Sequence, residues 1–305
     1  MATPPWGGGL LALTGATPDC KDFVTAKYAE QRRGMTANVD FSNICSTLHT
    51  LQLPRCNDAF ESLTELTSMP NLTYLQIDHG FRDLHGLDTL ATLCPKLRIL
   101  DLQWLCREDI ENLERFWQIL STMDNLRVLM LQLPVIPVSS NPPPLPKLTA
   151  IKLDDDCTDW ARESDNAKKV LSFLSRITTL RVLDLSLPAP ITSGWERLLH
   201  SCRLTHFSVS NYNFYCGPCR LPVDPSCYAD MEEFFLRNFV LKPDLANALA
   251  QAKKLSVLVL DVCYYELKAI RDIMNMHLKI TLQVSHLPNE DQGFFSEQAR
   301  GQDVR

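Results

Sequence analysis

Cys216 and Cys219 form the most distinctive chemical motif of the chain, Cys216-Gly-Pro-Cys219. Two thiols at this spacing carry out dithiol–disulfide exchange when the first lies at a helix N-terminus, which lowers its pKa. Pro222 and Pro225 exclude a helix directly after the second cysteine, so the motif lacks the context that redox chemistry needs. We therefore do not expect redox activity from this loop.

A zinc site is the second chemistry that these cysteines permit. Cys216, Cys219 and Cys227 could bind the metal together with His206, although their spacing is not an established zinc motif. The third interpretation, loop cysteines without a chemical role, is the one that we favour. We accordingly assign no metal and no cofactor.

The other polar residues do not form a catalytic motif. The seven histidines and 36 carboxylates contain no H-E-x-x-H and no G-x-S-x-G pattern, and the chain, with 11 glycines, has no glycine-rich phosphate loop. We conclude from the sequence that the protein is not an enzyme.

Charge and cysteine content constrain the partners and the compartment. The net charge of −6 argues against nucleic-acid binding, and no apolar run reaches the length of a membrane span. The 11 cysteines are scattered, and the N-terminus has no basic residue before its short apolar stretch, as a signal peptide would. We expect reduced thiols and a cytoplasmic or nuclear protein.

A repeat extends over most of the chain and must position these residues. The pattern L-x-x-L-x-L, with conservative replacements, recurs nine times, and a weaker tenth strand is predicted at Ile280–Val284. The average step is about 26 residues, inside the range of leucine-rich repeats. The nine copies begin at residues 48, 72, 97, 126, 148, 180, 204, 231 and 255.

The repeat predicts an α/β solenoid. In L-x-L, the two apolar residues point to one face of a short strand, and successive strands must stack in parallel to bury that face. The segments between strands then return on the outside. Because helices are wider than the spacing between strands, we expect a curved arc with a parallel concave sheet and with helices and extended segments on the convex side.

Several return segments carry helix signals. Apolar spacing of three to four predicts helices at 58–66 and 107–120, and Ser193-Gly-Trp195-Glu196 matches a capping box that opens a helix. Pro243 occupies a first helical position. The prolines between 134 and 146 instead predict an extended connector, with a proline-rich ligand as the alternative.

The chain resembles intracellular leucine-rich-repeat proteins over about residues 41–285, and it is most similar to the cysteine-containing repeats of F-box proteins. The similarity rests on Leu93-Cys94-Pro95-Lys96-Leu97, with Ser201-Cys202-Arg-Leu204 as a weaker echo. The resemblance implies buried structural cysteines and a protein-recognition role, including a possible place in the ubiquitin pathway. Residues 1–40 depart from that family because they contain no F-box pattern, which puts direct ligase recruitment in doubt.

These observations define three segments. Residues 1–40 are expected to be a partly disordered N-terminal segment or cap, with at best one short helix around 22–31. Residues 41–285 form the leucine-rich-repeat domain, with nine to ten repeats. A polar insertion follows Asp154, and residues 286–305 are expected to be a mobile tail.

The concave face is the predicted partner site. Counted from the first Leu of each copy, positions 3, 5, 7 and 8 project from the strands into the groove, where carboxylates outnumber Lys152 and Arg237. Trp104 is either an exposed anchor or folds back over its own repeat, and position 8 also provides His79, Asp155 and Asn238. The predicted partner-binding residues are Tyr74, Gln76, Asp78, Asp101, Gln103, Trp104, Met130, Lys152, Asp154, Asp184, His206, Phe235 and Arg237.

The sequence favours a monomeric, non-enzymatic protein-interaction scaffold whose partner could carry a basic surface. Substrate recognition of the F-box type is the specific form that the resemblance implies. The alternative is a regulator of an enzyme built on the same arc, either a GTPase activator or an enzyme inhibitor. An enzyme that uses the Cys216–Cys219 loop is the third hypothesis.

Overall fold

The computed structural model describes two compact units, residues 1–155 and 156–305. Several predictions fall outside the described residues: the helix at 58–66, the first half of the helix at 107–120, most of the proline-rich connector, the loop of Cys216 and Cys219, and the tail from 286. The described residues are 23–25, 47–53, 68–78, 85–103, 113–131, 143, 145–154, 164–187, 193–211, 221–261, 263–265, 267–276 and 281–285.

The first unit is a ladder of parallel strands in sequence order from β1 to β6, and every neighbouring pair of strands is parallel. Helices α4 and α5 each connect two of these strands. The elements are β1 (Phe23–Thr25), β2 (Thr50–Leu53), β3 (Tyr74–Asp78), α4 (His85–Leu93), β4 (Ile99–Gln103), α5 (Leu113–Thr122), β5 (Val128–Leu131) and β6 (Ala150–Asp154).

The second unit repeats this plan with the strand order β7-β8-β9-β11-β13 and a small parallel pair, β10-β12. Its elements are α6 (Ser164–Leu174), β7 (Val182–Leu187), α7 (Trp195–Ser201), β8 (His206–Asn211), the 3₁₀-helix η5 (Pro225–Tyr228), β9 (Glu233–Arg237), β10 (Val240–Leu241), α8 (Pro243–Ala250), β11 (Val257–Asp261), β12 (Tyr264–Tyr265), α9 (Leu267–Met276) and β13 (Thr281–Ser285).

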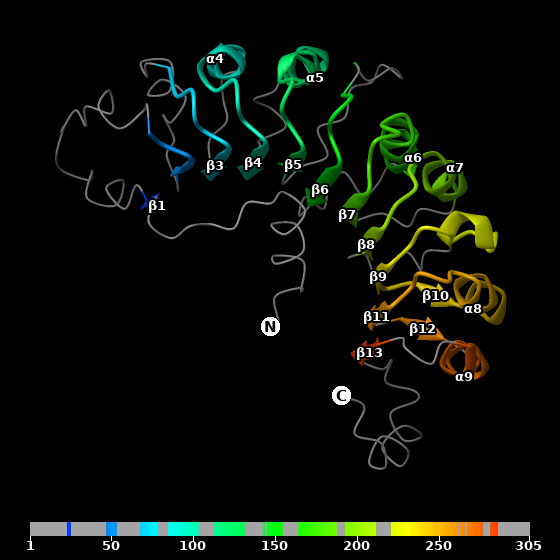
Figure 1. Ribbon diagram of the computed structural model, residues 1–305. Coiled ribbons are helices and arrows are strands. Elements are labelled where there is room, and N and C mark those ends of the chain that lie inside the picture. The colour runs from blue at the N-terminus through cyan, green and yellow to red at the C-terminus, as the bar shows by residue number, and fades with distance from the viewer. Residues whose placement is uncertain are drawn as a thin grey trace. The chain divides into compact units, whose positions relative to one another are not determined.

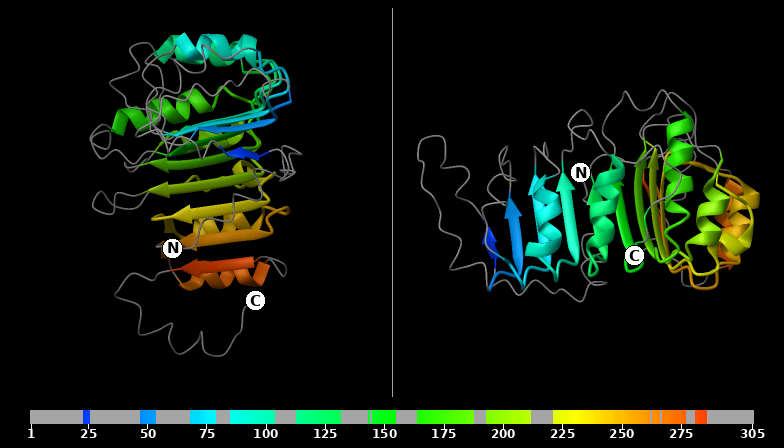
Figure 2. Two further views of the ribbon diagram at one scale, coloured as in Figure 1. Left: turned by 90° about the vertical axis from the view of Figure 1, so that its left-hand side faces the viewer. Right: turned by 90° about the horizontal axis from the view of Figure 1, so that it is seen from above.

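Within each unit the strands form one layer and the helices form a second layer on one side of it (Figure 1). The strands of a unit lie side by side and point in the same direction (Figure 2). This is the α/β leucine-rich-repeat fold that the sequence predicts. Among the described residues, no helix combines the length and the apolar character that crossing a membrane requires.

The strand register follows the repeat. In the first unit Leu75 pairs with Leu100, Leu100 with Leu129, and Leu129 with Ile151, which are the position-4 residues of successive copies. These four side chains are fully buried. The leucine and isoleucine residues at positions 1 and 6 of these copies are buried as well, so the apolar positions of the repeat form the core between strands and helices.

A recurrent turn precedes the strands. In seven copies the backbone N–H of the position-1 residue donates to the carbonyl three residues earlier, at 2.9–3.2 Å. The side chains of the residues that supply these carbonyls are all buried. A β-turn with proline at its second position is favoured, and Pro70, Pro95 and Pro146 occupy that position. The pairs are Met69–Leu72, Cys94–Leu97, Met123–Leu126, Leu145–Leu148, Ile177–Leu180, Tyr228–Met231 and Ala252–Leu255.

The second unit adds an aromatic cluster to this core. Phe207 stacks on Phe234 with ring centroids 5.4 Å apart, and Trp195 approaches both Phe207 and Phe239. Tyr228 also packs against Phe234, with ring centroids 5.8 Å apart. The aromatic rings therefore tie α7 and η5 to β8 and β9.

Two local predictions were wrong and one was confirmed. Residues 23–25 form a strand paired with β2 rather than part of a helix, because they extend the parallel sheet at its edge. The capping box at Ser193 does not form: α7 begins after Gly194, whose φ is +97°, and no side chain caps this helix. Pro243 is the first residue of α8, as predicted.

Candidate functional site

The face of the strands opposite the helices carries positions 3, 5 and 7, and we call it the strand face. In the first unit, pairing between neighbouring strands aligns Gln76, Asp101, Met130 and Lys152 in one row. Cross-strand neighbours of this kind lie about 5 Å apart, so a partner segment could contact several of them together. The strand register thus places these four residues in one row.

On the strand face of the first unit, the polar side chains of Gln76, Lys152 and Asp154 are partly exposed, whereas the position-3 residues Ile99, Val128 and Ala150 are buried. The Tyr74 hydroxyl donates to Gln76 Oε1 at 3.0 Å, which fixes both side chains along β3. On β6, Lys152 Nζ lies 3.9 Å from Asp154 Oδ2, and both side chains remain about one-third exposed. Such an exposed pair contributes little to stability and leaves both charges accessible to a partner.

The strand face of the second unit has an aromatic residue at its centre. Phe235 aligns with Ser208 on one side and Val259 on the other, and Asp184 is the next residue along the row. Phe235 is half-buried, whereas Ser208 and Val259 are buried. The small neighbouring Ser208 leaves the ring of Phe235 as the largest feature of this row.

Charged groups flank Phe235 at both ends of its strand. His206 Nε2 lies 3.7 Å from Glu233 Oε1, and Arg237 Nε lies 3.5 Å from Asp261 Oδ2. Each contact joins neighbouring strands at the same register, β8 to β9 in the first case and β9 to β11 in the second. An apolar ring between polar groups is the composition typical of a protein-binding hot spot and its rim.

Some predicted groove residues are less accessible than the strand alternation suggests. Asp101 is 7% exposed and Asp184 is 8% exposed, so neither carboxylate is the open surface charge that we expected. Asn238, predicted to project into the groove, is buried at 1% exposure. Its backbone N–H donates to Asp261 O and its Nδ2 donates to Asn211 O, which joins the ends of three strands.

Some predicted groove residues lie outside the part of the chain that the structure describes. Trp104, His79 and Asp155 are not among the described residues, and for Asp78 and Gln103 only the strand backbone is described. Their role at the strand face therefore remains a prediction.

The predicted zinc grouping is not the one that the described residues form. Cys227 lies on η5, where its Sγ is 3.5 Å from His200 Nε2, while His206 faces Glu233 from strand β8. Cys216 and Cys219 are outside the described residues. The contact between Cys227 and His200 is one that sequence reasoning missed; the two residues are 27 positions apart, about one repeat, and that offset is the signal that could have found them.

The Cys227 thiol is not an activated nucleophile. Burial raises its pKa to about 12, with a smaller contribution from the carboxylates of Asp224 and Glu196. A thiol with this pKa is protonated at neutral pH, whereas catalytic cysteines have lowered pKa values.

No protein-family model matches the chain, and no curated protein matches it. Among solved structures, an internalin from Listeria monocytogenes is similar with a TM-score of 0.35 and 14% sequence identity. The match covers 82% of this chain and 76% of the internalin chain. The strand register and the buried repeat positions of the chain define its leucine-rich-repeat fold.

Proposed function

We propose that the chain is a non-enzymatic protein-recognition module that binds a partner through its strand face. The observation that carries this proposal is Phe235, a half-buried ring between the His206–Glu233 and Arg237–Asp261 contacts. An aromatic anchor surrounded by polar groups that exclude water is the usual source of binding energy at a protein interface.

The partner contacts extend along the rows of each unit. In the first unit, Tyr74, Gln76, Met130, Lys152 and Asp154 are half-buried side chains that a partner can reach. The carboxylate of Glu233, whose side chain is 39% exposed, favours a partner with a basic surface, because complementary charge speeds association.

Recognition in the manner of the F-box leucine-rich repeats is the more specific form of this proposal. Its support is the burial of Cys94, Cys202 and Cys263, each at most 2% exposed, as the cysteine-containing repeats require. The Cys202 thiol donates to the carbonyls of Leu174, the last residue of α6, and of Ile177 in the turn that follows. The Cys263 thiol donates to the carbonyl of Leu236 in β9. Copurification of a ubiquitin-ligase adaptor with the full chain would support this form, and recovery of the partner without any adaptor would contradict it.

The test of the general proposal is proximity labelling in the native cell with the full-length chain. Phe235→Ala should remove specific proteins from the labelled set, because it truncates the anchor. Met274→Ala is the matched control, since Met274 is a 45% exposed large apolar side chain on helix α9. A labelled set that is unchanged by Phe235→Ala, in a variant with wild-type circular dichroism, would overturn the proposal.

A further inference from the structure

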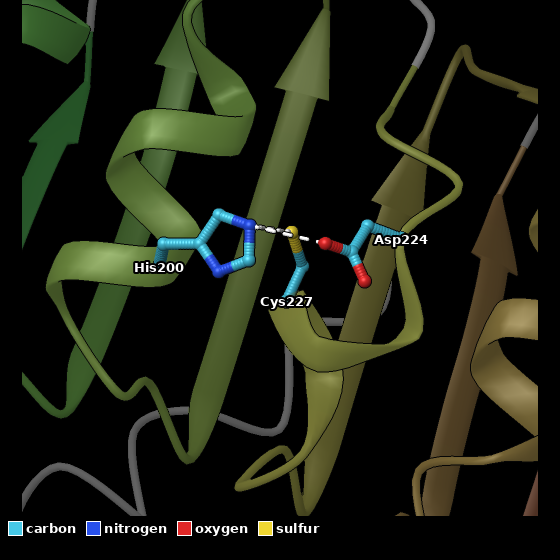
Figure 3. A group of neighbouring side chains, drawn as sticks. All are labelled: His200, Asp224 and Cys227. Atoms are coloured by element: carbon cyan, nitrogen blue, oxygen red, sulfur yellow. Dashed lines mark hydrogen bonds and ion pairs between the residues drawn. The ribbon is translucent and has the colours of Figure 1, made fainter.

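Three metal-ligating side chains converge on the helix side of the second unit (Figure 3). His200 lies in the last turn of α7, Asp224 directly precedes η5, and Cys227 lies within η5. One ligand atom from each residue lies within 4.8 Å of the other two. We propose that His200, Asp224 and Cys227 form a zinc site with a fourth position open to solvent.

The distances fit a tetrahedral zinc ion. His200 Nε2 is 3.3 Å from Asp224 Oδ2 and 3.5 Å from Cys227 Sγ. With Zn–N and Zn–O bonds of about 2.1 Å and a Zn–S bond of about 2.3 Å, a tetrahedron has an N···O edge of about 3.4 Å and an N···S edge of about 3.6 Å. Both edges that meet at His200 Nε2 therefore have tetrahedral length, and the ligand atoms of Asp224 and Cys227 lie within 4.8 Å of each other along the third edge.

The arrangement differs from that of a cysteine–histidine–aspartate catalytic relay. In such a relay, one ring nitrogen of the histidine faces the nucleophile and the other faces the carboxylate. Here the thiol and the carboxylate both approach the same nitrogen, Nε2 of His200. Two further ligand atoms therefore lie beside the imidazole nitrogen that would bind a metal ion.

Local structure orients the ligands in advance. Asp224 is the N-cap of η5, and its Oδ1 accepts a hydrogen bond from the Ser226 N–H at 2.9 Å, which leaves Oδ2 facing His200. The buried Tyr228 donates its hydroxyl to the Pro222 carbonyl at 2.7 Å and so holds the turn that carries Asp224 and Cys227. A ligand fixed by a second hydrogen bond is typical of metal sites.

Exposure gives the ion a route of entry. Cys227 is only 5% exposed, but the side chains of His200 and Asp224 are 40% and 44% exposed. The ion can therefore approach from the solvent side and keep a water molecule as its fourth ligand.

The donor set selects zinc among the common divalent ions. Calcium and magnesium prefer oxygen ligands, whereas a thiolate and an imidazole suit zinc. On binding, Cys227 releases its proton to solvent and its sulfur bonds to the metal. The ion would then link α7 to η5, which belong to the return segments of successive repeats.

The experiment uses the full-length chain carrying Cys216→Ser and Cys219→Ser, because those thiols could bind zinc independently. Zinc stoichiometry and affinity are measured by competition with a chromogenic chelator, and Co²⁺ is used as a spectroscopic probe. We expect one Zn²⁺ per chain and, with Co²⁺, the intense visible bands of a tetrahedral site together with a thiolate charge-transfer band.

Three variants in that background test the ligands. His200→Ala and Cys227→Ser should each weaken zinc binding by more than about 100-fold and remove or alter the Co²⁺ bands. Asp224→Asn can retain the cap to Ser226 while losing the carboxylate, so weaker binding in this variant does not reflect unfolding. His206→Ala is the matched control and should bind zinc as the background does.

Two results would overturn the proposal. One is a background protein without stoichiometric zinc. The other is a His200→Ala or Asp224→Asn variant that binds zinc as tightly as the background. Thermal unfolding gives an independent readout, since Zn²⁺ should raise the unfolding temperature of the background and of His206→Ala but not that of His200→Ala.

Discussion

Gly194 lies against Leu171 in a backbone conformation with a φ of +97° and a ψ of −16°. A Cβ atom at Gly194 would lie 3.3 Å from Leu171 Cδ1 in the core. Gly194→Ala should therefore lower the free energy of unfolding by about 1–2 kcal/mol, because a side chain is unfavourable at positive φ and must also displace Leu171. Urea unfolding of the purified chain measures the change.

Ser193→Ala is the control for Gly194→Ala. Ser193 is exposed, and α7 has no side-chain cap, so its hydroxyl should contribute little. If Ser193→Ala destabilised the chain as much as Gly194→Ala, this result would show that the capping box predicted from the sequence does form.

Leu100 tests the strand faces. It is fully buried between Leu75 and Leu129 in the position-4 row. Leu100→Ala should destabilise by about 2–5 kcal/mol, since it removes apolar contacts and leaves a cavity. Lys152→Ala, on the strand face of the same unit, should change stability by less than about 1 kcal/mol. Equal losses in chemical denaturation would show that the two faces are reversed.

Because of Cys263, we expect the free energy of unfolding to fall at alkaline pH. Burial raises the pKa of its thiol from 9.0 to about 12, so between these values the folded chain holds a proton that the unfolded chain releases. The stability from this group is complete below pH 9 and declines at higher pH by about 1.4 kcal/mol per pH unit, until the folded pKa is reached.

Unfolding of the wild type and of Cys263→Ala at pH 7.5, 9 and 10.5 measures this contribution. Cys263→Ala removes the titrating thiol, so its stability should fall less steeply above pH 9. An identical pH slope in both proteins would refute the assignment.

Substitution of Phe235 tests the binding site once a partner has been identified. Phe235→Ala should weaken binding by about 2 kcal/mol, close to a 30-fold loss, and mainly through faster dissociation. Glu233→Lys should instead slow association with a basic partner, most strongly at low salt. Glu233 suits this test better than Asp101 or Asp184 because its side chain is 39% exposed. Surface plasmon resonance at two salt concentrations separates the two rates.

The strands could be predicted from the sequence because each has its own local signal. Leu97, Leu100 and Leu102 occupy positions that only a one-sided strand explains, and the observed register matches the repeat numbering in every described pair of strands that belongs to two consecutive copies. The start of α7 could not be predicted in the same way. Its capping-box letters are present, but packing of Gly194 on Leu171 determines where the helix begins.

For the candidate site, the sequence predicts only the face of the sheet on which each residue lies. Alternation along a strand places Asp184 opposite the core, but its exposure depends on side chains from neighbouring strands, which a single repeat does not reveal. The cluster of His200, Asp224 and Cys227 matches no linear metal motif, because its members come from two different return segments. The offset of about one repeat between His200 and Cys227 is its only signal in the sequence.

The turn that precedes the strand in seven copies makes the repeats tolerant of insertions and deletions. Successive copies begin 22 residues apart at Leu126 and Leu148 but 32 residues apart at Leu148 and Leu180, and both pairs start with the same three-residue hydrogen bond. A change in the length of one return segment therefore does not alter the register of the strands that follow it. Evolution can lengthen, shorten or exchange these segments while the ladder stays aligned, so lineage-specific features should accumulate there and not in the strands.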